Sequence, residues 1–475
     1  MDELKIMAEA LYGYPMPDKD MIDLLLEKEV IGNNGKIIVL DDDPTGVQTV
    51  HDVSVYTDWS IDSIRKGFEE ESRLFFLLTN SRGFTALQTT KAHTEIAENV
   101  DKVAKKQNRN YLIISRSDST LSGHYPLETE VLKEVLEAKN EWNMDGEILC
   151  PFFKEGGRFT LDNIHYVKYG EELVPAGQTE FARDETFGYQ SSNLCEYVQE
   201  KTKGVFRKEE CICITLEMLR KMDINAIENR LLSVTGFQKI IVNAIDTIDV
   251  KIFCIALYRA MAKGKHYIIR SAAALVKAIG NISDRLLLSR TDMVLDKKAT
   301  GGIIVVGSHT KKTTEQLEEL QKINKICFIE MNSDLVLKGN ELEKETERIL
   351  QEEERLIQDG INVCVSTKRA LLKVENDTPE EALVRSVKIS DALKNCVGHL
   401  KVTPSFVLAK GGITSSDVGI KALHVKKAKV LGQIQPGIPV WQTGEESLFP
   451  GIPYIIFPGN VGNADTLKKA VEILL

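Results

Sequence analysis

Short apolar runs that end in polar turn residues alternate with longer segments of helical periodicity along the first half of the chain. The runs 36–40, 53–56, 73–78 and 111–114 are rich in β-branched, aromatic and leucine residues, which indicates strands. The segment from about 86 to 107 has the periodicity of an amphipathic helix. Strands that alternate with helices favour a mainly parallel sheet with helices on both faces. The pattern therefore predicts an α/β fold.

The second half repeats this alternation. Strands are predicted at 303–306, 361–365, 406–409 and 454–457, and a Glu/Lys-rich helix at 341–359. Thr313 and Gln316 have the spacing of a capping box. The polar, basic stretch 281–300 indicates a domain boundary. We predict a helical segment over 1–33, a first domain over 34–285 and a second over 300–475, each domain a mainly parallel sheet flanked by helices.

One segment departs from the alternation. Residues 150–190 are rich in glycine, phenylalanine and polar residues and have little helical periodicity. Long irregular segments inside compact domains are usually functional or form lids. We therefore expect this segment to contribute to a binding site.

Composition and charge restrict the classes of partner. The chain has 475 residues, of which 43% are apolar and 27% are charged, as in ordinary globular proteins. Its formal charge of −10 argues against a nucleic-acid partner. No apolar run is long enough to cross a membrane, no signal peptide is evident, and the eight cysteines form no Cys-x-x-Cys motif. We expect a cytoplasmic protein without membrane partners. The sequence does not decide between a monomer and a homodimer.

The candidate chemistry of the first half lies where three predicted strands end. The run 36–40 is followed by Asp41-Asp42-Asp43-Pro44-Thr45-Gly46, and the run 73–78 by 79–83 with Arg82. The run 111–114 is followed by 115–124 with Arg116, Asp118 and Ser119. The carboxyl ends of parallel strands meet at one edge of a sheet, where α/β proteins bind ligands. Carboxylates can accept a proton or bind a metal, and the arginine fork suits a carboxylate or a phosphate. These side chains predict one pocket for a small anion.

The second half contains three junctions at which a strand, a glycine loop and a helix follow one another. They lie at Gly307, at Gly411-Gly412 and at 459–462. Glycine lets backbone amides approach a phosphate, and a helix N-terminus supplies free N–H groups. None of the loops matches Gly-x-x-x-x-Gly-Lys-Ser/Thr or Gly-x-Gly-x-x-Gly. Together they favour a nucleotide site of another type, and hence a phosphotransferase.

These motifs resemble, in order and over about 36–465, those of the four-carbon acid sugar kinases. In the first half, the family motif Asp-Asp-x-Thr-Gly is similar to residues 42–46, and the family Ser-Arg is similar to residues 81–82. The family motif Lys-x-Asp-Ser-Thr-Leu-Arg-Gly is similar to residues 116–123. In the second half, the family motif Gly-Ser-x-Ser-x-x-Thr-x-x-Gln is similar to residues 307–316, and Gly-Gly-x-Thr is similar to residues 411–414. The family motif Ser-Gly-Asn-x-Gly is similar to residues 458–462, which include Asn460. The resemblance implies an acid-binding domain, a nucleotide-binding domain and phosphorylation of threonate, erythronate or 3-oxo-tetronate. We expect an active site in the cleft between the domains.

The resemblance also implies roles for individual residues, with ATP and Mg²⁺ as cofactors and no metal ligand assigned. Asp42 and Asp43 would be catalytic, one of them as the base. Thr45, Arg82, Arg116, Asp118 and Ser119 would bind the sugar acid. The nucleotide would be bound by Ser308, Thr310, Gly411, Gly412, Thr414 and Gly459.

The sequence departs from the family pattern at three places. Ser122 stands where the family has an arginine, Arg116 where it has a lysine, and Phe457-Pro458 where it has Lys-Ser. Two cations are therefore missing from their usual positions, which marks a divergent member and leaves the sugar acid unidentified. It also motivates a second hypothesis, a non-catalytic sugar-acid-binding protein that does not turn over ATP.

The first strand supports a third hypothesis, a phosphatase of the haloacid dehalogenase type. Asp-x-Asp-x-Thr at Asp41, Asp43 and Thr45 resembles the first motif of that class, and 77–80 its second. Asp41 would be the nucleophile, Asp43 the acid/base and Mg²⁺ the cofactor. The class needs a downstream acid pair, for which Asp292 and Asp296 are a poor fit. It also leaves the three glycine loops unexplained.

Overall fold

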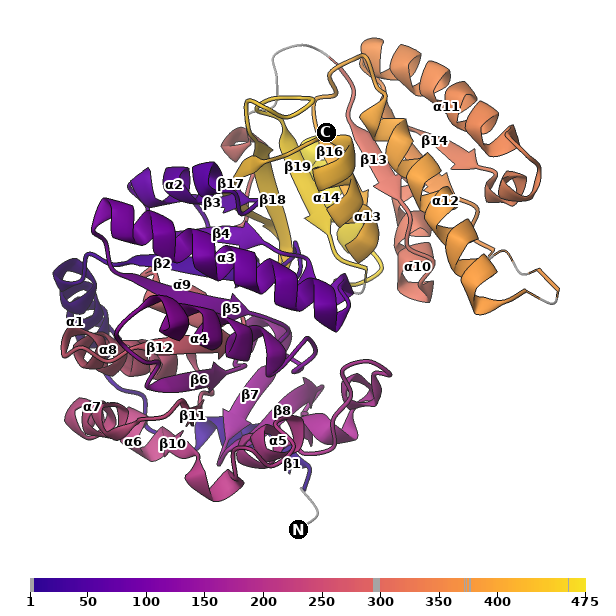
Figure 1. Cartoon of the computed structure of the whole chain (residues 1–475). Coiled ribbons are helices and arrows are strands. Elements are labelled where there is room, and N and C mark those ends of the chain that lie inside the picture. Colours follow the sequence, from indigo (N-terminus) through magenta and orange to yellow (C-terminus); the bar gives the residue numbers. More distant parts are fainter. Residues whose placement is uncertain (1–3, 294–299, 371, 373, 376, 460) are drawn as a thin grey trace. The chain divides into compact units, whose positions relative to one another are not determined.

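The computed structural model describes residues 4–293, 300–370, 372, 374–375, 377–459 and 461–475 (Figure 1). The chain divides into two compact units, formed by 1–50 with 58–284 and by 51–57 with 285–475. The sequence-based division did not separate the short segment 51–57 from the first half. It joins the second unit because β3 (Val53–Tyr56) pairs antiparallel with β17 (Lys427–Gln435).

The first unit contains a parallel sheet, as the alternating pattern predicted. Its strands are buried along almost their whole length, because helices cover both faces of a parallel sheet. Every pairing between the neighbouring strands of this sheet is parallel. In spatial order the strands are β10 (Ile212–Ile214), β11 (Gln238–Val242), β6 (Gly146–Cys150), β12 (Tyr267–Ser271), β5 (Tyr111–Arg116), β2 (Lys36–Asp41) and β4 (Leu74–Leu78).

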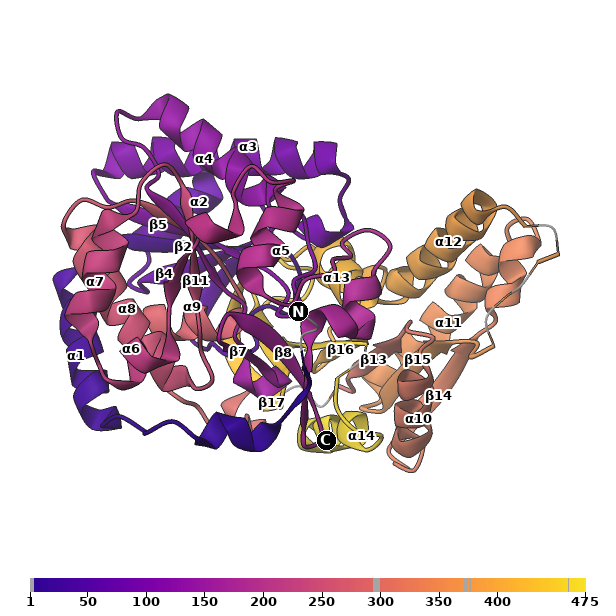
Figure 2. The same ribbon diagram turned by 90° about the horizontal axis from the view of Figure 1, so that it is seen from below.

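Helices cover this sheet in two layers, which are visible from below in Figure 2. One layer contains α2 (Ile61–Glu69), α3 (Ala86–Gln107) and α4 (Leu127–Lys139). The other contains α1 (Lys19–Gly32), α6 (Leu216–Arg220), α7 (Ile224–Ser233), α8 (Thr247–Ala262) and α9 (Ala273–Ile279). The predicted helix 86–107 is confirmed as α3, which begins with a capping box between Thr85 and Gln88 and buries one apolar stripe.

The segment 150–190, expected to be irregular, forms most of a small antiparallel sheet, which β1 (Ile6–Met7) near the N-terminus completes. Its strands are β1, β9 (Glu172–Pro175), β8 (Ile164–Tyr169) and β7 (Arg158–Leu161), in that order. Asp162 and Asn163 both have positive φ and form the two-residue turn between β7 and β8. Such a turn needs residues that tolerate the left-handed region, and Asp-Asn is a weaker signal than Asn-Gly. Helix α5 (Leu194–Lys201) follows this sheet.

The sheet of the second unit is parallel on one side and antiparallel on the other. In spatial order its strands are β3, β17, β18 (Ile438–Thr443), β19 (Pro453–Phe457), β16 (Val407–Lys410), β13 (Ile303–Val306), β15 (Asn362–Thr367) and β14 (Ile326–Met331). The strands from β19 to β14 are parallel, and β3, β17 and β18 pair antiparallel with their neighbours. The chain therefore has the predicted two-domain, mainly parallel α/β architecture.

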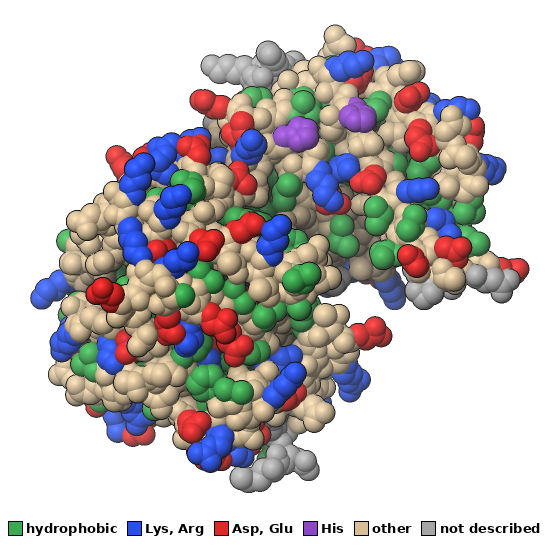
Figure 3. All heavy atoms as spheres, in the orientation of Figure 1, with side chains coloured by type: hydrophobic (Ala, Val, Ile, Leu, Met, Phe, Trp, Pro, Cys, Tyr) green, Lys and Arg blue, Asp and Glu red, His purple; other side chains and the backbone are tan. Residues whose placement is uncertain are grey.

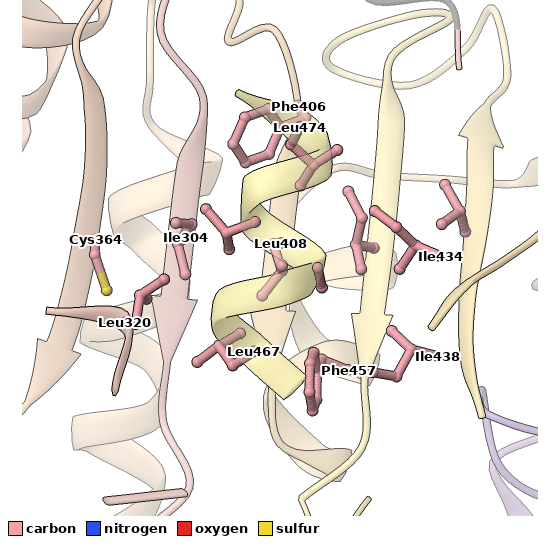
Figure 4. Close-up of a cluster of buried hydrophobic side chains, with 14 of the residues drawn as sticks. Ile304, Leu320, Cys364, Phe406, Leu408, Ile434, Ile438, Phe457, Leu467 and Leu474 are labelled. Carbon is pink, nitrogen blue, oxygen red and sulfur yellow. The ribbon is translucent and has the colours of Figure 1, made fainter. Parts of the chain in front are cut away.

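A hydrophobic core lies between this sheet and two of its helices, α10 (Lys311–Leu320) and α14 (Thr466–Leu474). Figure 4 shows Leu467 and Leu474 of α14 over side chains of the sheet, with Leu408 and Phe457 among them. The remaining helices are α11 (Glu341–Gln358), α12 (Pro379–Gly398) and α13 (Gly412–Asp417), and α11 and α12 lie side by side (Figures 1 and 2). No helix in the described ranges combines the length and the apolar character needed to span a membrane.

The predicted capping box at Thr313 and Gln316 is wrong. Helix α10 begins three residues earlier, and Thr310 is its N-cap, accepting a hydrogen bond from the amide of Thr313. Gln316 instead donates to the carbonyl oxygens of Val461 and Asn463, at 3.0 and 2.9 Å. Gln316 thus ties the helix to a loop that is distant in sequence, which the local spacing could not show.

Candidate functional site

The polar ends of β4, β2, β5 and β12 lie together at one edge of the sheet in the first unit. Asp41, the last residue of β2, is in register with Leu78 of β4 and with Arg116 of β5, and Arg116 is in register with Ser271 of β12. The parallel topology therefore brings the three predicted strand ends into one cluster, as expected from the sequence.

Arg82 binds the two aspartates that follow β2. Its Nη2 and Nε donate to the two carboxylate oxygens of Asp42, at 2.8 and 3.3 Å, and its Nη1 donates to Asp43 at 3.3 Å. Thr45 donates to Asp43 from its amide and its hydroxyl, at 2.8 and 2.5 Å. The Asp42 side chain is 3% exposed, whereas those of Asp43 and Arg82 are 22% and 30% exposed. Asp43 and Arg82 are therefore the charged members of this group that a solute can reach.

The three aspartates differ in the direction in which their surroundings shift the pKa. Burial raises the pKa of Asp41 to about 7, although Arg116 opposes this shift, and burial also raises the pKa of Asp42. Burial acts on Asp43 in the same direction, but Arg82 and the hydrogen bonds from Thr45 outweigh it and lower the pKa of Asp43. Asp43 is therefore ionised at neutral pH.

Arg116 is buried, and its side chain contacts the carboxylates of Asp41 and Asp42. Its side chain is 6% exposed, and its Nη1 donates to Asp41 at 3.1 Å and lies 3.7 Å from Asp42. Within the described ranges, its Nε has no hydrogen-bond partner. This geometry makes Arg116 a residue that positions the aspartates.

The loop 117–123 covers this cluster from the end of β5. Ser117 donates from its hydroxyl to Asp42 at 2.8 Å. Asp118 is half-buried and accepts hydrogen bonds from the amide and hydroxyl of Thr120, and the carbonyl of Ser119 accepts one from His165 at 2.7 Å. His165 lies on β8, so the segment 150–190 supports this loop.

Sequence reasoning missed a buried ion pair behind these residues, between Arg270 of β12 and Glu128 of α4. Glu128 also accepts hydrogen bonds from Ser81, at 2.7 Å, and Ser115, at 3.3 Å. Burial alone would raise the pKa of Glu128, but Arg270, His93 and the hydrogen bond from Ser81 lower the pKa to about 2. A Cβ on Gly123, which has a φ of +119°, would lie 2.7 Å from Nη2 of Arg270. The signal that could have found Arg270 is a charged residue near the end of an otherwise apolar strand.

The three glycine loops of the second unit also come together. A Cβ on Gly307 would lie 2.3 Å from Oγ1 of Thr414, and one on Gly411, where φ is +126°, would lie 3.2 Å from Ser308. Thr313 donates to Ser308 at 3.0 Å and to the carbonyl of Gly459 at 3.4 Å. The structure thus groups the predicted nucleotide-binding residues of this unit, which are Ser308, Thr310, Gly411, Gly412, Thr414 and Gly459.

Two cations near these loops were missed. Arg369 donates to the carbonyl of Ser308, at 2.6 Å, and to the hydroxyl of Thr314, at 3.0 Å, while its buried Nη1 has no partner among the described residues. Lys410 is the last residue of β16 and is fully buried. A lysine directly before Gly-Gly at the end of an apolar strand was the available signal.

A groove of about 580 Å³ begins beside the first and second glycine loops. Gly307 and Thr414 line one part of it. The rest is lined by apolar side chains, among them Leu383, Val387 and Ile413, together with polar and charged ones such as Arg385 and Asp417. Figure 3 shows hydrophobic side chains exposed on this side of the second unit, over α12 and α13. The volume is within the range of small-molecule sites.

Among the residues that the structure describes, no group of three or more His, Cys, Asp or Glu side chains could hold a metal ion. Two residues named in the sequence analysis, Asp296 and Asn460, lie outside the described residues.

The fold and the two groups of residues define a two-domain α/β protein with a polar ligand site on one domain and a glycine-loop site on the other. Comparison with known families agrees with this class. Residues 37–279 match the model of a sugar-binding N-terminal domain, and residues 303–467 match that of a nucleotide-binding C-terminal domain. The chain belongs to the four-carbon acid sugar kinase family, which has this domain pair.

Solved structures share the fold at low sequence identity. The Haemophilus influenzae protein HI1011, of the family model DUF1537, is 16% identical with a TM-score of 0.61, covering 92% of this chain and 100% of its own. A putative tRNA synthase from Salmonella typhimurium LT2 is 14% identical with a TM-score of 0.65, covering 92% and 98%. None of the curated proteins matches the sequence.

Proposed function

We propose that this protein is an ATP-dependent kinase that phosphorylates a hydroxyl group of a small, four-carbon sugar acid. The observation that carries the proposal is the group of Asp42, Asp43 and Arg82, in which an ionised carboxylate and a guanidinium are both accessible at one strand edge. A sugar acid offers what such a group recognises, a carboxylate for the arginine and hydroxyls for the aspartates.

Asp43 is the better candidate for the general base. It is ionised and 22% exposed, whereas the Asp42 side chain is 3% exposed and burial raises its pKa. Asp43 would accept the proton of the attacking hydroxyl as the new O–P bond forms. Asp42 would fix Arg82, whose guanidinium would bind the carboxylate of the acid.

The other predicted residues would orient the acceptor. Thr45 fixes the carboxylate of Asp43, and Asp118 is half-buried and available for a hydroxyl group. Ser119 lies in the same loop and would contribute its hydroxyl. Arg116 would act by holding Asp41 and Asp42 in place, because it is too buried to meet the substrate.

The nucleotide would bind at the second unit. The glycine loops offer close backbone approach to phosphates, and the apolar part of the groove suits a purine ring and ribose. Mg²⁺ would supply charge neutralisation of the phosphates. Direct transfer requires the two sites to meet when both substrates are bound.

A cytoplasmic location fits this proposal, because ATP is available there and all eight cysteines are free thiols.

Burial argues against the phosphatase hypothesis. Asp41, the required nucleophile, is 1% exposed and is hydrogen-bonded to Arg116. An attacking carboxylate has to reach a phosphorus atom, which this one does not.

The test is a coupled assay of ADP release over a panel of four-carbon sugar acids, with and without Mg²⁺. We expect acid-dependent ADP release that requires Mg²⁺. Binding of an acid without ADP release would overturn the kinase in favour of a sugar-acid-binding protein. Release of phosphate from small phosphoesters without ATP would support the phosphatase instead.

A further inference from the structure

The sequence has lost a lysine that the family places just before its last glycine loop, and the structure contains another lysine at that place. Phe457-Pro458 stands where the family has Lys-Ser. Strands β16 and β19 are parallel neighbours, and Lys410 of β16 is in register with Phe457 of β19. We propose that Lys410 supplies from the adjacent strand the positive charge for the nucleotide phosphates, an inference that rests on the proposed function.

The side chain of Lys410 crosses from its own strand to the loop that follows β19. Its Nζ donates to the carbonyl oxygens of Pro458 and Gly459, at 2.6 and 3.0 Å, and lies 4.4 Å from the centre of the Phe457 ring. The ammonium group therefore lies over residues 457–459, where the family lysine would begin. Phe457 packs under it as a cation–π partner.

The backbone and side chain of Lys410 connect all three glycine loops. Its carbonyl accepts a hydrogen bond from the amide of Gly307, at 3.3 Å, in the first loop. It directly precedes Gly411 in the second loop, and its ammonium group binds Gly459 in the third. The same Gly459 carbonyl accepts a hydrogen bond from Thr313 of α10. One lysine thus lies at the junction of the three loops.

The charge of Lys410 is not compensated within the described part of the chain. It is fully buried and forms no salt bridge there, so its only polar partners are backbone carbonyls. Burial and the nearby positive charge of Lys312 lower the pKa of Lys410 to about 7. A buried cation without a carboxylate is unfavourable in an empty site, and an arriving phosphate group would provide its counter-charge.

The experiment removes the lysine from position 410 on β16 and places a lysine at position 457 on β19. Binding of an N-methylanthraniloyl derivative of ADP is measured by fluorescence for the wild type, Lys410→Leu, Phe457→Lys and the double variant Lys410→Leu/Phe457→Lys. We expect Lys410→Leu to weaken binding about tenfold, because the buried positive charge acts on the phosphates through the protein rather than by direct contact. The double variant should recover most of the affinity. The corresponding adenosine derivative, which has no phosphates, should bind the wild type and Lys410→Leu equally.

Controls separate a structural effect from a loss of charge. Lys469→Leu removes an exposed lysine of the same unit and should leave affinity unchanged. Lys410→Met keeps an unbranched apolar side chain, and it is used in place of Lys410→Leu if that variant unfolds at a lower temperature than the wild type. Unchanged affinity in a folded Lys410 variant overturns the inference, and so does a folded double variant that recovers nothing. If the wild type does not bind the ADP derivative, the result overturns the nucleotide site of the proposed function rather than the role of Lys410.

Discussion

The carboxylate of Asp41 occupies the space in which a side chain at residue 46 would begin. A Cβ on Gly46 would lie 2.0 Å from one carboxylate oxygen of Asp41 and 2.1 Å from the other. No methyl group fits at these distances. The glycine of the Thr-Gly motif therefore allows the chain to fold back over the end of β2, so that Asp43 and Thr45 lie beside the buried acid.

We predict that Gly46→Ala moves the Asp41 carboxylate and disrupts the cluster. Overpacking of this kind costs about 1–3 kcal/mol of unfolding free energy. The measurements are thermal unfolding and activity in the coupled assay, which should fall at least about tenfold. Gly32→Ala is the matched control, because a Cβ at Gly32 meets nothing within 4 Å. A variant as stable and active as Gly32→Ala would contradict the packing argument.

Asp43→Asn should abolish turnover while leaving the fold intact. The amide keeps the shape of the carboxylate but does not accept the proton, and general base catalysis contributes about 10²–10⁴-fold to a rate. Turnover is measured by ADP release, and folding by circular dichroism and thermal melting. Wild-type activity in this variant would exclude Asp43 as the base and leave Asp42 as the candidate.

Arg82 and Arg116 should respond differently to replacement by lysine. Arg82 uses three N–H groups on two carboxylates, a fork that an ammonium group does not reproduce, whereas Arg116 donates one hydrogen bond to Asp41. We expect Arg82→Lys to lower kcat/KM for the acid about tenfold or more, and Arg116→Lys to be tolerated. Equal losses in the two variants, measured in the same assay, would count against this division of roles.

The raised pKa of Asp41 predicts a pH-dependent contribution to stability. In the unfolded chain an aspartate titrates near pH ~4, whereas burial raises the pKa of Asp41 to about 7. Between these values the folded state keeps a proton that the unfolded state has lost, so stability falls as pH rises, by up to about 1.4 kcal/mol per pH unit. Below pH ~4 and above pH ~7 this contribution is constant.

Asp41→Asn removes this titration. Denaturant unfolding at pH 5, 6 and 7 should show the variant gaining stability relative to the wild type as pH rises. Glu71→Gln, at an exposed position of the same unit, is the control and should show no such trend. A difference between Asp41→Asn and wild type that is independent of pH would show that Asp41 is ionised throughout.

The apolar groove of the second unit should distinguish nucleotides from acids. Ile413 is 76% exposed, so Ile413→Glu should fold normally. A purine ring that covers part of this side chain would lose about 1 kcal/mol of apolar contact, which raises KM for ATP roughly fivefold and leaves KM for the acid unchanged. Leu87→Glu, at a similarly exposed leucine of the first unit, is the control. An unchanged KM for ATP would place the nucleotide elsewhere.

The sequence alone predicted the elements that carry the chemistry. The apolar runs before Asp41, before Arg82 and at 111–114 are strands, and because parallel strands place their carboxyl ends at one edge, Asp42, Asp43 and Arg82 had to lie close together. The glycine loops were also predictable, since a glycine between a buried strand and a helix is a local pattern.

Only the tertiary structure decided which charges are paired and which are accessible. Arg116 and Arg82 are equivalent as sequence signals, yet one is buried against Asp41 and the other is partly exposed. Arg270, Glu128 and Lys410 act across strands and helices that are far apart in the sequence. Burial and long-range pairing depend on the packing of the whole domain, and local patterns of residues do not determine them.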